Sequence, residues 1–369
     1  MKRLPGLDLL RAIAIVWVML FHSWIVGGLS TIFAGVQSSG WMGVDLFFVL
    51  SGYLIGGQLL RPLKNGVALD FLSFYICRSY RILPAYAVVL AMYFLLPGFN
   101  REGPLAPPWE FLTYTLNIFI DYAHEPAFSH AWSLCVEEHF YLVFPLIAWL
   151  LTRRPTVGKV LLVAIAVVAF GMALRGVLWL HGHERFLELI YYPTWCRLDG
   201  LLAGVLLAAL QTYRPAAWSW CQKHANDVIL PAGLLLLALG LYVCRQQASH
   251  ATATFGYPLL AAAFSMLVIA GAAPTSLLAM VTIPSVHWLA MISYSLYLIH
   301  KAMFKLAEKY MPLPFAEHPL AIFVAYASLT LLGGAALHYL VEAPFLAIRD
   351  RRRPSVLPIA HAAVVTRSE

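Results

Sequence analysis

The sequence has little charge. Of its 369 residues only 12% are Asp, Glu, Lys or Arg, whereas 61% are apolar. Soluble globular domains contain about 25% charged and about 45–50% apolar residues. The excess is too large for one soluble core, so lipid must solvate much of the surface. The net charge of +7 comes from basic residues between the apolar runs. This is typical of membrane topology, and it excludes a nucleic-acid groove.

The sequence also lacks the patterns of a disulfide framework, a zinc site and a cleaved signal peptide. Its five cysteines are scattered without CxxC spacing, so we expect small buried residues. His22, His139, His300 and Glu137 offer no i, i+4 histidine pair, and we predict no metal. No small-residue cleavage site follows the first apolar run, which we therefore expect to remain as a signal-anchor.

Ten segments are apolar enough to span a membrane, which takes about 20 residues each. They cover 7–28, 41–60, 80–97, 131–151, 159–180, 190–211, 228–244, 256–273, 288–309 and 319–347. The predicted fold class is an all-α integral membrane protein with about ten transmembrane helices. A shorter apolar piece, 109–121, is predicted to be interfacial or re-entrant.

The distribution of Lys and Arg predicts that both termini are cytoplasmic, because positive charge concentrates on that side. In this orientation, the basic residues left on the opposite side are Arg101, Arg185, Arg245 and Lys309. With no internal repeat in the sequence, we expect one membrane domain, 1–349, and a basic, disordered cytoplasmic tail, 350–369.

Ionisable side chains inside spans are costly and predict function. Arg11 and His22 are eleven residues apart in the first span. They therefore project from one helix face, about 16 Å apart along the axis. Arg11 lies near the cytoplasmic end, where a snorkelling role also fits, and His22 lies in the outer half.

Several other ionisable residues fall in the same outer layer as His22. Counting inward from the span ends places both His22 and Glu137 at about 9 Å depth. The remaining members of this layer are Asp45, Arg197, Asp199 and His300. Charges at this depth must face water or one another, so we predict a polar chamber that opens outward.

The stretch WSLCVEEHFY, 132–141, contains Glu137 and Glu138 in succession. Neighbouring helical residues differ by about 100°, so only one of them can face the chamber. If Glu137 accepts a hydrogen bond from His22, the imidazole becomes a better general base. An interhelical clamp explains the pair equally well.

A second group of candidate site residues lies toward the predicted cytoplasmic side. Arg78 and Arg81 stand at i and i+3 on one helix face, an arrangement that suits bidentate binding of phosphate and also suits positive-inside anchors. Ser51 and Gly52 lie near mid-membrane, where they either let a slender chain pass or allow close helix packing.

Seven ordered segments, covering nearly the whole chain, resemble the acyltransferase-3 family of multi-pass bacterial membrane acyltransferases. They are GLDLLRAIAIVWVMLFH, GVDLFFVLSGYLI, FYICRSYRILPAY, HAWSLCVEEHFYLVFP, CRLDGLLAG, ISYSLYLIHK and VEAPF. The resemblance implies that His22, paired in its motif with Arg11, is essential for acyl transfer. It associates Arg78 and Arg81 with an acyl-CoA donor.

The resemblance further implies that Ser51 and Gly52 line the donor path and that Glu137 belongs to the SLxxE motif, with Glu138 as its companion. Asp45, Arg197 and Asp199 fall in family blocks whose roles are less settled. His139 stands where many relatives have glutamine, and we assign it no role. Because some relatives carry a fused hydrolase-like domain that this sequence lacks, the membrane domain is expected to act alone.

The expected function is O-acyl transfer in the bacterial cytoplasmic (inner) membrane, from acetyl-CoA to a hydroxyl of an extracytoplasmic or lipid-linked glycan. His22, oriented by Glu137 or Asp45, serves either as general base or as the residue that accepts the acyl group first. Macrolides and lipo-oligosaccharides are alternative acceptors. A proton-coupled permease is the alternative from another class, although neither an inverted repeat nor paired broken helices favour it.

Overall fold

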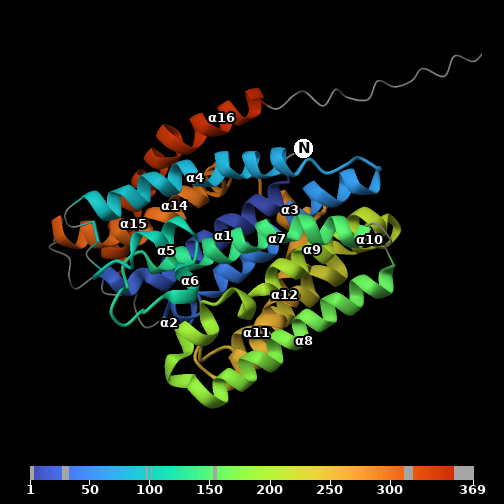
Figure 1. Ribbon diagram of the computed structural model, residues 1–369, viewed down its shortest axis with the longest axis horizontal. Coiled ribbons are helices and arrows are strands. Elements are labelled where there is room, and N and C mark those ends of the chain that lie inside the picture. Colours follow the sequence, from blue (N-terminus) through green and yellow to red (C-terminus); the bar gives the residue numbers. More distant parts are fainter. Residues whose placement is uncertain are drawn as a thin grey trace, which may run out of the picture.

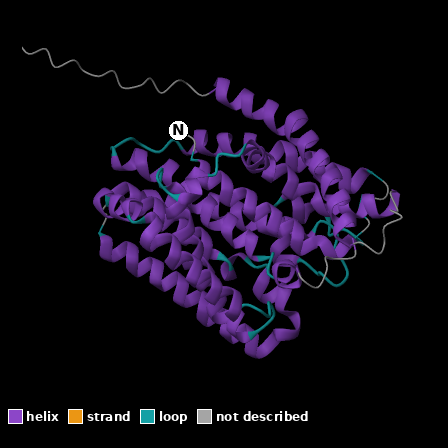
Figure 2. Ribbon diagram, turned by 180° about the vertical axis from the view of Figure 1, so that it is seen from behind, coloured by secondary structure: helices purple, strands orange, loops and turns teal. Residues whose placement is uncertain are grey.

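The computed structural model describes residues 4–26, 33–96, 99–100, 102–152, 156–310 and 319–352. These residues form helices and loops without a strand, which confirms the predicted all-α class (Figure 2). The longer helices are α1 (Pro5–Phe21), α3 (Met42–Lys64), α4 (Phe71–Leu95), α7 (Trp132–Thr152), α8 (Val157–Gly182), α9 (Leu198–Tyr213), α11 (Leu230–Val243), α12 (Tyr257–Ala272), α14 (Pro284–Tyr310), α15 (Pro319–Leu337) and α16 (Ala343–Arg352). The shorter ones are α2 (Ala34–Ser38), α5 (Pro108–Leu112), α6 (Leu116–Phe119), α10 (Pro215–Lys223) and α13 (Leu277–Met280).

Seven helical segments in the described part of the chain are long and apolar enough to cross a membrane. They are Pro5–Ile25, Met42–Lys64, Ser129–Leu150, Gly158–Arg185, Ala225–Val243, Thr252–Ala272 and Ala321–Arg352. The other three predicted spans fall on α4, α9 and α14, of which α9 has only 16 residues. The count of ten and the cytoplasmic termini stay predictions. Helix α16 continues through the first residues of the predicted tail to Arg352, and residues 353–369 lie outside the described part.

The spanning segments differ in how deeply they lie in the bundle. The apolar window of the α3 segment is 78% buried, whereas that of the α8 segment is 17% buried. Figure 1 shows α8 along one edge of the bundle, and its Leu162 is 68% exposed. Such apolar surface suits lipid, in keeping with the sequence composition.

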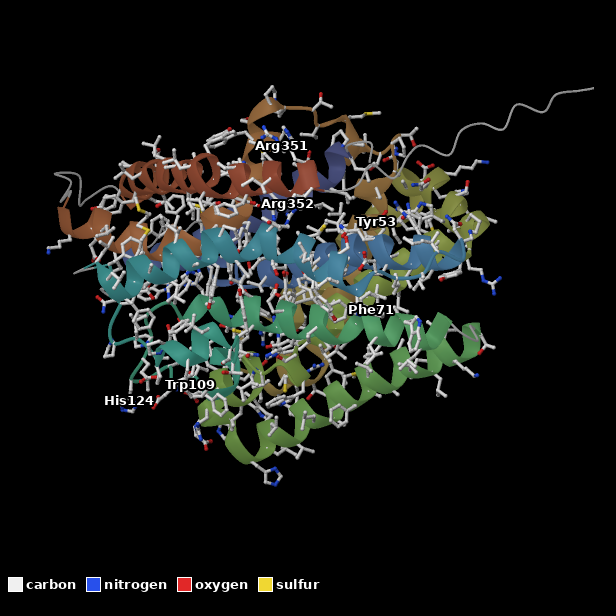
Figure 3. The ribbon with its side chains drawn as sticks, turned by 45° about the horizontal axis from the view of Figure 1, so that its top comes forward. Tyr53, Phe71, Trp109, His124, Arg351 and Arg352 are labelled. Carbon is white, nitrogen blue, oxygen red and sulfur yellow. The ribbon has the colours of Figure 1, made fainter. Side chains whose placement is uncertain are left out.

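The two ends of the bundle are built differently. The apolar piece 109–121 forms the short helices α5 and α6 instead of a span. Figure 1 shows α5 and α6 toward one end of the bundle and α10 toward the other. Figure 3 shows Trp109 and His124 on one side of the molecule, away from Tyr53 and Phe71.

Glycines allow α3 and α9 to pack closely. A Cβ on Gly52 would clash with the backbone carbonyl of Leu201, and a Cβ on Gly204 would clash with that of Val49. Gly52 therefore allows the close packing of α3 and α9, while its place on the donor path stays a prediction.

We expect Gly52→Ala to destabilise the protein by about 1–3 kcal/mol, because overpacking forces neighbouring backbone to shift. The measurement is the thermal midpoint of the purified protein in detergent. Gly57→Ala is the matched control on the same helix, because its Cβ would meet nothing closer than Arg61 at 3.7 Å. Equal midpoints for the two variants would contradict this account of Gly52.

Candidate active site

Two cavities lie next to each other inside the bundle. The first, here called the basic cavity, has a volume of about 130 Å³ and is lined by residues that include Arg11, Ser51, Arg78, Arg81, Glu137 and Tyr141. The second, here called the histidine cavity, has a volume of about 180 Å³ and is lined by residues that include His22, Trp41, His130, Trp132, Tyr191 and Lys301. Val44 and Tyr297 line both, so the cavities meet at these two side chains.

Three arginines from two helices converge on the basic cavity. Arg11 of α1 donates to the Ser293 hydroxyl at 3.2 Å, and Arg78 and Arg81 come from consecutive turns of α4. The Arg78 guanidinium stacks 3.9 Å above the Tyr141 ring, and its buried Nε has no hydrogen-bond partner among the described residues. This grouping of positive charge suits a ligand that carries phosphates.

Glu137 belongs to the basic cavity. It accepts hydrogen bonds from the Ser51 hydroxyl at 2.8 Å and from the Tyr141 hydroxyl at 2.9 Å. The predicted pair of Glu137 with His22 is wrong in this geometry, because His22 lines the other cavity and bonds to different partners. The sequence predicted equal depth for the two residues, but equal depth does not determine which way each helix turns its side chain.

His22 is placed by the end of α1. The helix ends at Phe21 and tightens into the 3₁₀ turn His22–Val26. The Nδ1 of His22 lies 3.0 Å from the Val18 carbonyl and 3.1 Å from Nε2 of His300 on α14. The same Val18 carbonyl also accepts the backbone N–H of His22, so the side chain and the backbone of this residue are both fixed to the last turn of α1. The ring is held through Nδ1, while the residue lines the histidine cavity.

Several polar residues of this cavity were not predicted, among them Lys301, His130 and Ser129. Lys301 lies 3.2 Å from the Ser129 hydroxyl and forms an ion pair with Glu102 at 2.5 Å. His130 lies next to Ser129, and its Nε2 is 3.1 Å from the Leu298 carbonyl. Lys301 directly follows His300 in SYSLYLIHK, so the same segment carried the signal for both. His130 begins the segment HAWSLCVEEHFYLVFP, which therefore carried a signal for it too, whereas Ser129 precedes that segment and had no such signal.

Asp45, which we predicted to be a catalytic candidate, lines neither cavity. Its Oδ1 accepts from Arg197 at 2.9 Å, and the Arg197 guanidinium lies 4.1 Å from the centre of the Tyr257 ring. Asp199 pairs likewise with Arg175 of α8, at 2.8 Å and 3.2 Å. The four charges form two buried ion pairs that join α3, α8 and α9.

Arg175 was missed by the sequence analysis, although its position carried a signal. It is an arginine inside the predicted span 159–180, where ionisable residues always require an explanation. The explanation is structural: the guanidinium also donates to the carbonyls of Ala253 and Cys196. The Arg175 side chain is therefore fully buried, although the α8 segment is the least buried of the seven apolar segments.

We expect Asp45→Asn to lower the free energy of unfolding by about 3–5 kcal/mol, because it leaves Arg197 buried without a carboxylate. Thermal unfolding in detergent measures this effect. Asp121→Asn is the control, since Asp121 pairs with His124 at the surface and exposed pairs contribute about 0–1 kcal/mol. An Asp45→Asn protein as stable as wild type, yet without acyl transfer, would return Asp45 to the catalytic candidates.

The remaining candidates are placed as follows. Glu138 follows Glu137 on α7 and lines neither cavity, as expected for neighbours that differ by about 100°. Nδ1 of His139 lies 2.7 Å from the Thr194 hydroxyl and joins α7 to the 3₁₀ turn Thr194–Cys196 before α9. The described residues contain no group of three or more His, Cys, Asp or Glu side chains placed to hold a metal ion.

Comparison with known proteins gives a consistent result. The acyltransferase-3 family, described as an acyltransferase domain, matches residues 4–339. "Putative O-acetyltransferase SACOL0978" of Staphylococcus aureus (strain COL) is 28% identical over 99% of this chain and 62% of the relative. "O-acetyltransferase OatA" of Staphylococcus aureus (strain NCTC 8325 / PS 47) is 26% identical over 93% of this chain and 57% of the relative.

The chain thus spans less than two thirds of the length of these curated relatives. No solved structure matches it. The family match nevertheless runs from the start of α1 into the π-helical segment His338–Glu342 after α15, and so it includes both cavities and every side chain that lines them. By this match, the chain belongs to the acyltransferase-3 family.

Proposed function

We propose that the chain transfers an acetyl group from acetyl-CoA to a hydroxyl of a carbohydrate. The observation that carries this proposal is the meeting of two unlike cavities at Val44 and Tyr297. One cavity concentrates arginines, and the other presents His22 among aromatic rings. The printed names of the relatives, which are O-acetyltransferases, support acetyl as the acyl group.

The basic cavity suits the donor. The phosphates of acetyl-CoA bind Arg78 and Arg81, whose planar guanidinium groups match phosphate oxygens. Arg11 adds a third positive charge to the same wall. The pantetheine arm, roughly 15–20 Å long, then passes Ser51 and covers the distance of about 16 Å between the levels of Arg11 and His22. The thioester reaches His22 near Val44 and Tyr297, which line both cavities.

His22 performs the chemistry as a general base. Its Nε2 takes the proton of the acceptor hydroxyl while the hydroxyl oxygen attacks the thioester carbonyl carbon. The carbon–sulfur bond breaks, and the leaving thiolate takes the proton from Nε2. The products are the acetyl ester and free CoA. In the covalent alternative, Nε2 itself carries the acetyl group between the two steps.

The histidine cavity suits a sugar. The rings of Trp41, Trp132, Tyr191 and Tyr192 line it, and aromatic faces pack against the apolar faces of sugar rings while the tyrosine hydroxyls offer hydrogen bonds. Tyr122, from the segment between α6 and α7, also lines this cavity. The acceptor we propose is an exported or lipid-linked glycan at the bacterial inner membrane.

Mass spectrometry of surface glycans from cells with and without the gene tests the proposal. We expect glycans one acetyl group heavier when the gene is present, and the purified protein in lipid should release CoA from acetyl-CoA in the presence of these glycans. A difference of another acyl mass would replace acetyl as the transferred group. Unchanged glycans together with unchanged acetyl-CoA would overturn the proposal.

A further inference from the structure

Two imidazole rings in contact constrain each other's protons. His300 lies on α14 and is fully buried, and its Nε2 is 3.1 Å from Nδ1 of His22. The ring centres are 4.8 Å apart with an angle of 57° between the planes. A hydrogen bond between two neutral imidazoles requires one nitrogen to donate and the other to accept.

The backbone decides which nitrogen donates. Nδ1 of His300 lies 2.7 Å from the Tyr297 carbonyl, which can only accept, so His300 carries its proton on Nδ1. Its Nε2 is then an acceptor, and the proton between the rings belongs to Nδ1 of His22. The Val18 carbonyl, 3.0 Å from the same Nδ1, requires the same assignment. Nε2 of His22 is consequently the nitrogen with the free lone pair.

We infer that His300 is the positioning residue of His22, in the role that the sequence analysis gave to a carboxylate. His300 holds the ring through Nδ1 and keeps Nε2 unprotonated. Its own Nε2 accepts more strongly once His22 gains a proton, because hydrogen bonds to charged donors are stronger. No proton needs to leave Nδ1 at any step. The consequence for acyl transfer rests on the proposed function.

The charged and titratable groups around the pair leave this arrangement intact. Lys301 is bound to Glu102 and Ser129. His130 packs 4.9 Å from the His300 ring centre, but it directs its Nε2 to the Leu298 carbonyl. Neither supplies an acceptor to Nδ1 of His22, so within the described residues His300 and Val18 alone perform this role.

NMR of the full chain tests the proton positions without any need for activity. We expect long-range proton–nitrogen spectra of ¹⁵N-histidine protein in alkaline buffer to show His22 and His300 both protonated at Nδ1 and bare at Nε2. A scalar coupling between Nδ1 of His22 and Nε2 of His300 should accompany them, and His300→Gln assigns the resonances. Finding His300 protonated at Nε2 would overturn the inference.

Kinetics test the consequence. We expect His300→Ala to lower kcat about 10–100-fold, as the loss of an orienting partner does for metal-bound histidines, with little change in KM for acetyl-CoA. His300→Gln should recover part of this loss, because its amide oxygen can accept at the position of Nε2. His181→Gln is the matched control: His181 is exposed and bonds the carbonyl four residues earlier as His22 does.

The outcomes separate this inference from the proposed function. Wild-type kcat in both His300 variants would overturn the positioning role while leaving His22 as the base. Equal losses in His300→Ala and His300→Gln, with both proteins folded, would overturn the role of the accepting atom. If the wild-type protein transferred no acyl group, the proposed function would fail, and the NMR spectra would still decide the proton positions.

Discussion

Replacing His22 with alanine should lower kcat for acyl transfer about 10²–10⁴-fold, the usual contribution of a general base. The cause is the loss of Nε2, the nitrogen with the free lone pair, on a side chain that lines the histidine cavity. The measurement is CoA release from acetyl-CoA by the purified protein in lipid with the acceptor glycan. Transfer near the wild-type rate would exclude His22 from the chemistry.

The same variant separates chemistry from binding. Because His22 lies outside the basic cavity, binding of acetyl-CoA by His22→Ala should stay within about twofold of wild type, and an unchanged thermal midpoint should confirm the fold.

Incubation of the wild-type protein with acetyl-CoA alone distinguishes the general-base route from the covalent route. An acetyl group on His22, found by mass spectrometry, would favour the covalent route over direct attack.

Helix periodicity and the cost of buried charge predicted a considerable part of the site. The eleven-residue spacing placed Arg11 and His22 on one face at two levels, and the structure puts them in separate cavities. The i, i+3 pair Arg78 and Arg81 does share one cavity wall. Each of these inferences needs only the geometry within one helix, which the sequence specifies directly.

The sequence did not show which side chains of different helices face each other. Counting residues inward from the span ends placed Glu137, Asp45 and His300 in one membrane layer with His22. That count gives no information on how each helix is rotated about its own axis. In the structure α1 packs on α14, so His22 meets His300. Asp45 of α3 faces α9 and is neutralised by Arg197 there. The carboxylate that was expected as a partner lies in the other cavity, and a histidine takes its place.

The arginine pair offers the second large effect. We expect the double variant Arg78→Gln, Arg81→Gln to raise KM for acetyl-CoA about 10²-fold or more. Charge-assisted hydrogen bonds contribute about 1.5–3 kcal/mol each, and every 1.4 kcal/mol is about a tenfold change in affinity. The turnover number at saturating donor should change little, because these side chains lie away from His22. Steady-state kinetics with varied acetyl-CoA give both constants.

A truncated donor shows whether the arginines act on phosphate. S-acetylpantetheine has the same thioester and arm without the phosphates of CoA, so the double variant and the wild type should use it with equal KM. Arg61→Gln is the control: Arg61 bonds Gln211 at 2.6 Å outside the basic cavity. If the double variant lost as much affinity for S-acetylpantetheine as for acetyl-CoA, the arginines would shape the cavity without recognising phosphate. The donor's charged end would then have to lie elsewhere.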